Sequence, residues 1–174
     1  MHALRRIAPT ALASLAVSAC SSMPPLEPVE RVDLERFMGD WYVIANIPTF
    51  LEKGAHNAVE SYELDSDGTI ATTFTFRDGA FDGPVKTYTP RGFITSESNA
   101  VWGMQFIWPI KADYRIVYLD ETYSTTVIGR NRRDFVWIMA REPQIPATRY
   151  EEIFTMLGDV GYDVSAIQQV PQQW

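Results

Sequence analysis

Residues 37–48, FMGDWYVIANIP, decide the fold. Gly39 stands two residues before Trp41, and the residues after Trp41 alternate as a β-strand does until Pro48 ends the strand. Just upstream, VDLERFMG predicts one short helical turn with Asp33 as its N-cap and Gly39 as its terminator. The chain therefore places a large indole at the opening of its first strand.

Seven more strand patterns follow, and then one helical pattern. A turn with Asp-Gly at 67–68 is typical of hairpins, and the fourth strand is expected to bend near Pro90 and Gly92. Apolar residues at helical spacing lie between Pro146 and Gly158. The expected strands after the first cover residues 57–64, 69–77, 84–94, 99–107, 113–120, 122–130 and 134–141.

Eight short strands followed by one helix predict an all-β fold, an eight-stranded antiparallel up-and-down β-barrel with a C-terminal α-helix packed outside. Closure removes exposed strand edges, and eight strands enclose an interior that can hold one small ligand. A β-sandwich of seven or eight strands is the competing fold. A sandwich would bury both inner faces densely and would not need the lone helix.

Length and composition suit one packed domain. The chain has 174 residues, of which 46% are hydrophobic and 13% aromatic. Its net charge is -7, and its basic residues are scattered. Nucleic-acid binding is therefore not expected, because phosphate contact needs a concentrated positive face.

The N-terminus carries the features of a secreted lipoprotein. Arg5 and Arg6 precede a short apolar run, and VSAC at 17–20 resembles the lipobox of bacterial lipoproteins. That resemblance implies a signal peptide over 1–19, a lipidated Cys20 with a Pro-rich spacer over 20–31, and a domain over 32–174. By resemblance to the sorting of Gram-negative lipoproteins, Ser21 in place of Asp favours the outer membrane of a Gram-negative bacterium, with the domain facing the periplasm. The alternative is an ordinary signal peptide with a chance cysteine.

Three segments together resemble the lipocalin family. GDW at 39–41 is similar to its G-x-W signature, DYRIVYLD at 113–120 to its second motif, and Arg141 in WIMAREP to its third. The resemblance covers residues 32–174 and is nearest to bacterial outer-membrane lipoprotein lipocalins. It implies that Gly39, Trp41 and Arg141 form a structural closed end. Arg141 would stack on Trp41, worth about 1–2 kcal/mol.

Strand alternation selects the side chains that face the barrel interior. These residues can fill a core or line a cavity, and such an interior suits an acyl chain with its polar head near the rim. The expected ligand contacts are Trp137, Tyr114, Phe76, Phe74, Tyr118 and Met139.

Glu60 is the unusual residue, since it shares a face with Tyr62 and an unpaired buried carboxylate is costly. It is expected to pair with Arg91 or Arg115, or to lie at the wet rim. His56 is the only histidine of the expected domain, so neither a metal site nor a haem ligand is predicted, and no cofactor is expected.

The leading functional hypothesis follows from the resemblance. It is a membrane-anchored lipid-binding protein, not an enzyme, that carries or stores fatty acids, lysophospholipids or similar amphiphiles in the cell envelope. Its partners would be that ligand and the membrane, and a homodimer stays open. Two alternatives remain: an enzyme acting on a lipophilic substrate, through carboxylate chemistry at Glu60, and a structural lipoprotein with a filled barrel.

Overall fold

The computed structural model describes residues 23–174. The predicted signal peptide and Cys20 lie outside the described residues.

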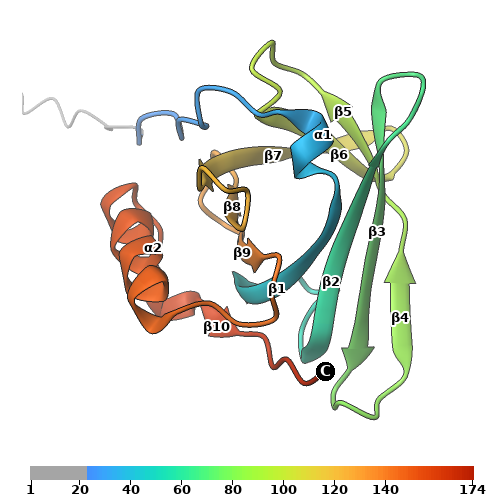
Figure 1. Ribbon diagram of the computed structural model, residues 1–174, viewed down its shortest axis with the longest axis vertical. Coiled ribbons are helices and arrows are strands. Elements are labelled where there is room, and N and C mark those ends of the chain that lie inside the picture. Colours follow the sequence, from blue (N-terminus) through green and yellow to red (C-terminus); the bar gives the residue numbers. More distant parts are fainter. Residues whose placement is uncertain (1–22) are drawn as a thin grey trace, which may run out of the picture.

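Eight antiparallel strands close into a barrel, as the sequence predicts (Figure 1). Each pairs with its neighbour in chain order, and β1 pairs with β9 to complete the closure, which rules out the sandwich. The strands are β1 (Gly39–Ile47), β2 (Ala55–Leu64), β3 (Thr69–Asp78), β4 (Val85–Tyr88) with β5 (Arg91–Ile94), β6 (Val101–Ile107), β7 (Ile110–Leu119), β8 (Thr125–Gly129) and β9 (Val136–Ala140).

The fourth barrel strand is the bent one. β4 and β5 both pair with β3, and Thr89 and Pro90 separate them. Proline has no N–H to give to the sheet, so pairing breaks there and resumes at Arg91. The predicted bend at Pro90 is confirmed.

The helices lie at one end of the barrel and beside it. α1 (Leu34–Phe37) is capped by Asp33, whose side chain accepts from the Arg36 N–H at 3.3 Å. Gly39 follows the C-cap Met38 with φ +92°, so it ends α1 as predicted, and it also opens β1. α2 (Ala147–Asp159) packs outside the barrel, followed by the 3-10 helix η1 (Val164–Ala166) and β10 (Gln168–Gln169), which pairs with β1 (Figure 1). Among residues 23–174 neither α-helix has the length and hydropathy to cross a membrane.

Two apolar clusters result from strand alternation. On β3 the predicted inward face, Ile70, Thr72, Phe74 and Phe76, is buried. The second cluster lies between the outer face of the barrel and α2, and includes Ile153 and Leu157 from α2 together with Ala45, Val127 and Ile138 from the strands.

Tyr118 does not face the interior, contrary to the prediction. The register between β7 and β8 shifts between Ile116 and Tyr118, and such a bulge moves the following side chain to the other face. Tyr118 therefore packs in the outer cluster, where Arg149 of α2 donates a hydrogen bond to its hydroxyl.

The predicted spacer over 20–31 is also corrected from Pro24 onward. Leu26 is buried, and its N–H donates to Asn131 Oδ1 at 2.8 Å. The Val29 N–H donates to the Ile116 carbonyl at 2.8 Å, and Arg133 donates to the Pro24 carbonyl. The segment from Pro24 onward is thus docked on the barrel, because its carbonyls and apolar side chains find partners there.

Candidate ligand-binding site

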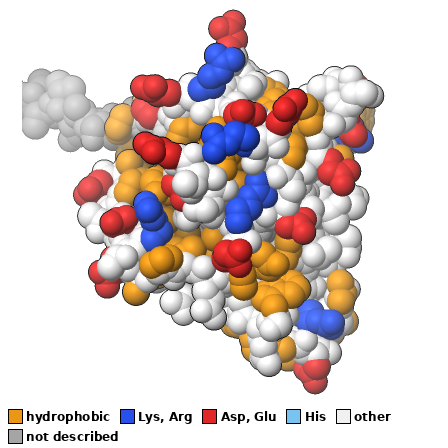
Figure 2. All heavy atoms as spheres, viewed as in Figure 1, with side chains coloured by type: hydrophobic (Ala, Val, Ile, Leu, Met, Phe, Trp, Pro, Cys, Tyr) orange, Lys and Arg blue, Asp and Glu red, His pale blue; other side chains and the backbone are white. Residues whose placement is uncertain are grey.

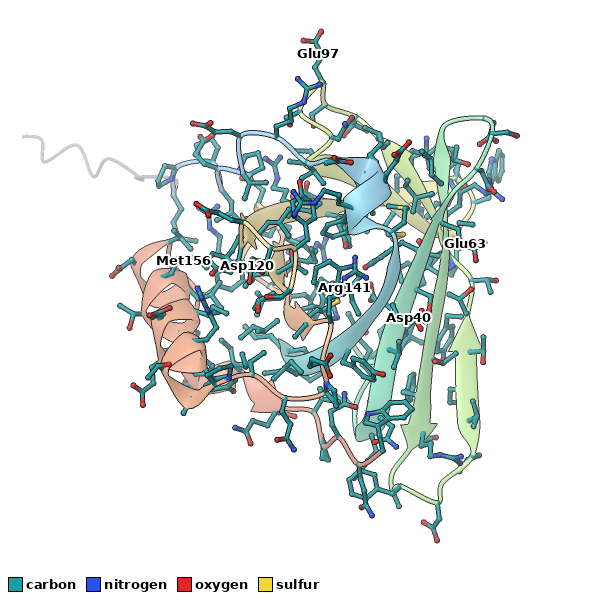
Figure 3. The ribbon with its side chains drawn as sticks, viewed as in Figure 1. Asp40, Glu63, Glu97, Asp120, Arg141 and Met156 are labelled. Atoms are coloured by element: carbon teal, nitrogen blue, oxygen red, sulfur yellow. The ribbon has the colours of Figure 1, made fainter. Side chains whose placement is uncertain are left out.

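The end of the barrel next to α1 is closed by Trp41 and Arg141. The Arg141 guanidinium lies 3.8 Å from the centroid of the Trp41 ring. It also donates to the carbonyls of Asp40 and Met38, each at 2.7 Å, and of nearby α1 residues (Figure 3). Gly39 has φ +92°, and a Cβ there would lie 3.4 Å from Arg141 Nη1. The three residues of the predicted closed end therefore lie together, with a backbone turn that favours glycine.

Aromatic rings fill the barrel just above this closure. Phe37 packs 5.0 Å from Trp41 and 5.7 Å from Tyr62, while Trp102 stacks on Tyr114 at 4.9 Å. The Trp41 indole N–H donates to the Phe37 carbonyl at 2.8 Å. This half of the interior is solid and forms the floor of the space above it.

A cavity of about 230 Å³ occupies the other half of the barrel. It opens at the end where β1 leads into β2, β6 into β7, and β8 into β9. Most of its wall is apolar. The wall includes Phe74, Tyr88, Pro90, Met104, Ala112, Tyr114 and Trp137, with the polar residues Glu52, Glu60, Thr72, Asp113 and Arg130.

Three of the six predicted ligand contacts line this cavity: Trp137, Tyr114 and Phe74. Phe76 and Met139 are buried in the cluster inside the barrel but do not reach the cavity wall. Phe76 is screened because it packs on Phe74, with ring centroids 5.2 Å apart. Tyr118, on the outer face, is not part of the site.

Several lining residues were not predicted. Met104 could have been predicted, since it alternates with the inward-facing Trp102 on β6. Tyr88 is placed by the structure, where it stacks with Phe76. Glu52 had no sequence signal. It lies in the loop after β1, where it accepts from the Trp137 indole N–H at 2.6 Å and from the Thr49 N–H at 2.8 Å. This contact holds the loop against the cavity and orients the indole.

Glu60 has no arginine partner, which corrects the prediction. Arg91 pairs with Asp65 at 2.7 Å, and Arg115 with Asp113 at 3.0 Å. Glu60 faces the cavity and pairs across the sheet with Trp41 on β1, so it stands at the floor.

A tyrosine contacts the Glu60 carboxylate instead. Tyr62 hydrogen-bonds to it, and the hydroxyls of Tyr62 and Tyr114 are 2.8 Å apart. Burial raises the pKa of Glu60 to about 7; the Tyr62 hydrogen bond opposes this rise, and the nearby Glu52 charge adds to it.

The rim of the open end exposes apolar side chains. They come from the loop after β1 and from the β6–β7 hairpin. The exposed fractions are 82% for Phe50 and Trp108, 72% for Ile107, 70% for Ile110 and 50% for Phe106. Such a patch continues the apolar lining of the cavity outward.

On the face shown in Figure 2, charged side chains form no patch comparable to the apolar rim, because Lys, Arg, Asp and Glu are interspersed there. Within residues 23–174 no three His, Cys, Asp or Glu side chains come close enough together to hold a metal ion.

A barrel sealed at one end by a tryptophan–arginine stack and hollow at the other defines a ligand-binding β-barrel protein. The chain belongs to the lipocalin family, whose Lipocalin-like domain matches residues 32–172.

Similar proteins come from several kingdoms. Temperature-induced lipocalin-1 of Arabidopsis thaliana is 29% identical over 154 residues, which cover 84% of this chain and 83% of that protein. Outer membrane lipoprotein Blc of Escherichia coli (strain K12) is 28% identical over 178 residues, covering 99% and 98%. The structure of apocrustacyanin C2 superposes with a TM-score of 0.65 at 11% identity, over 81% of this chain and 80% of that one, and supports the fold alone. Family membership and the apolar cavity support the binding of a small hydrophobic ligand.

Proposed function

We propose that the protein binds single-chain amphiphiles, such as fatty acids and lysophospholipids, and carries or stores them in the cell envelope. The observation that carries this proposal is the cavity of about 230 Å³ above a solid aromatic floor. Trp137, Tyr114 and Phe74 are the proposed contacts with the apolar chain.

The size of the cavity limits how a ligand fits. Ligand pockets are typically about 300–1,000 Å³ and bury most of a drug-sized ligand. A long alkyl chain would therefore fill this cavity and extend across the rim, where Phe50, Phe106 and Ile107 are exposed. The exposed rim thus has a role in this proposal: it covers the part of the chain that leaves the barrel.

Filling the cavity should abolish binding. Ala112 lines it on β7, so Ala112→Trp would place an indole in the space that the ligand needs. We expect affinity for a fatty acid to fall about a hundredfold or more, which corresponds to roughly 2.7 kcal/mol. Quenching of tryptophan fluorescence during a fatty-acid titration measures this loss.

The matched control is Thr73→Trp, which adds the same side chain to an exposed position of β3. It should bind as the wild type does. Equal affinity of both variants for the fatty acid would place the ligand outside the cavity. Native mass spectrometry should recover the bound amphiphile at unchanged mass; a chemically altered product would indicate catalysis instead.

Attachment to the outer membrane through Cys20 is the second part of the proposal. It is supported by the lipobox resemblance at 17–20 and by the similarity to proteins named outer membrane lipoprotein Blc. Because one acyl chain alone binds membranes only marginally, diacylation is expected. Cys20→Ala should move the protein from the membrane to the soluble fraction, or leave it unprocessed. Full processing with unchanged membrane retention would refute this anchor.

A further inference from the structure

The hydrogen bonds at the cavity floor have a fixed direction while Glu60 is ionised. An ionised carboxylate only accepts, so in the Glu60–Tyr62 bond the Tyr62 hydroxyl is the donor. A phenol has a single proton to donate, and therefore the bond between the two tyrosine hydroxyls must be donated by Tyr114. The Tyr114 proton is therefore directed to the Tyr62 oxygen and the Tyr62 proton to Glu60, so Tyr114 presents only acceptor lone pairs to the cavity.

Two further donors of the wall are directed to protein groups. The Trp137 N–H is directed to Glu52, and the Thr72 hydroxyl lies 3.9 Å from the Met104 sulfur, a weak acceptor. The cation of the wall, Arg130, directly follows β8 at the open end and pairs with Asp134 at 3.3 Å. The floor thus offers acceptors and a carboxylate, while positive charge stands at the mouth.

We propose that the floor of the cavity is a receptor site for a hydrogen-bond-donating head group, above all an ammonium group on a single alkyl chain. The head would enter first and bond to Glu60 and the Tyr114 oxygen, with the chain running past Trp137 to the apolar rim. This inference rests on the proposed function, since it ranks ligands within the class of single-chain amphiphiles.

Charge and hydrogen bonding both favour this ranking. Within residues 23–174 no Lys, Arg or His lies within ion-pair distance of Glu60, so a ligand cation would supply the missing counter-charge. A carboxylate head at the floor would meet the lone pairs of the Tyr114 oxygen and would be repelled by Glu60. An acid therefore binds with its head at the mouth, near Arg130, and an alcohol falls between the amine and the acid.

The pH dependence follows from the groups that line the site. Those that titrate or carry charge are Glu60, Glu52, Asp113, Arg130, Tyr62, Tyr88 and Tyr114. Burial raises the pKa of Glu60 to about 7, and raises the pKa values of Tyr62 and Tyr114, which stay protonated. An alkylammonium titrates near 10.4, as lysine does. Lowering the pH through 7 protonates Glu60, and amine affinity should fall while acid affinity rises.

The test compares decylamine, 1-decanol and decanoic acid on the full-length protein, by displacement of the fluorescent probe N-phenyl-1-naphthylamine. At about pH 8, decylamine should bind about tenfold tighter than decanoic acid, as expected for a charged hydrogen bond. Glu60→Gln should remove this preference. Glu63→Gln, which removes the same charge from an exposed position of β2, should keep it (Figure 3).

Two results would overturn the inference: decanoic acid that binds as tightly as decylamine at about pH 8, or a preference for decylamine that survives Glu60→Gln. The wild-type pH series tests the same claim without any substitution, and an amine affinity that does not change between about pH 8 and pH 6 would also contradict it. If none of the three displaces the probe, the proposed function itself fails, together with the inference.

Discussion

Replacing Trp41 with alanine is expected to lower the free energy of unfolding by about 3–5 kcal/mol, the usual cost of truncating a large buried aromatic residue. Trp41 is fully buried, it packs on Phe37, and it is the ring on which Arg141 lies. Truncation opens a cavity at the closed end and leaves the Arg141 guanidinium without its aromatic partner. Urea unfolding followed by circular dichroism measures the change.

Two comparisons give this prediction its controls. Arg141→Ala should cost less, about 2 kcal/mol, through lost stacking and unpaired carbonyls. Trp137→Ala should spare stability more than Trp41→Ala does and should weaken ligand binding, because Trp137 lines the cavity. An Arg141→Ala protein with unchanged stability and abolished binding would show that the closed end has been assigned the wrong role.

The second large effect is a gain. Glu60→Gln should raise the free energy of unfolding at about pH 8 by about 3 kcal/mol, because it removes an ionised carboxylate from the floor of the cavity. The folded-state pKa of Glu60 is about 7, against an ordinary value of 4.5. A gap of 2.5 pKa units corresponds to about 3 kcal/mol.

The sign follows from proton binding. Between the two pKa values the folded protein holds a proton on Glu60 and the unfolded chain does not, so folding is favoured as the pH falls through 7. The penalty is complete above pH 7 and is gone below pH 4.5. The advantage of Glu60→Gln over the wild type should therefore shrink steadily from about pH 8 to pH 5.

Glu63→Gln is the control here too, since Glu63 is exposed on the same strand. Its stability should follow that of the wild type across the pH range. Equal stability of Glu60→Gln and wild type at about pH 8 would mean that Glu60 is not held in a costly environment. Functional sites often keep residues that lower the stability of the fold. Glu60 at the floor of the cavity would be such a residue.

Much of the fold could be predicted because its signals are local. Alternation located the strands to within a few residues. The short glycine-to-tryptophan spacing placed Gly39 and Trp41 at the start of the first strand. The seventh expected strand was too long at its start, since Asp120 accepts from the Ser124 N–H at 2.7 Å and holds those residues in a turn.

The site could be predicted only where alternation is uninterrupted. Trp137 and Tyr114 were placed correctly on the inner face, because no bulge interrupts the alternation between them and the neighbouring positions of the same strand from which it was counted. Tyr118 was not, because a single bulge after Ile116 reverses the face of the strand. Alternation along a strand identifies which side chains face the interior, but not which part of the interior they reach. Phe76 and Met139 therefore face inward without lining the cavity.

The partners of Glu60 depend on contacts across the barrel. Tyr114 comes from a strand that is distant in sequence and meets Tyr62 only after the barrel closes. The arginines expected to pair with Glu60 each have a carboxylate close at hand. Arg115 bonds to Asp113, two residues away, because side chains two apart on a strand share a face.

A crystal structure with an amphiphile that carries bromine at the end of its alkyl chain would show whether that chain occupies the barrel. A bromine anomalous signal is expected in the barrel cavity or at its rim, with the chain in contact with Trp137 and Tyr114. A second hollow lies outside the barrel, between β1 and α2, lined in part by Ile44, Ile145 and Tyr150. Bromine in that outer hollow, with no chain beside Trp137, would mean that the barrel cavity is not the binding site.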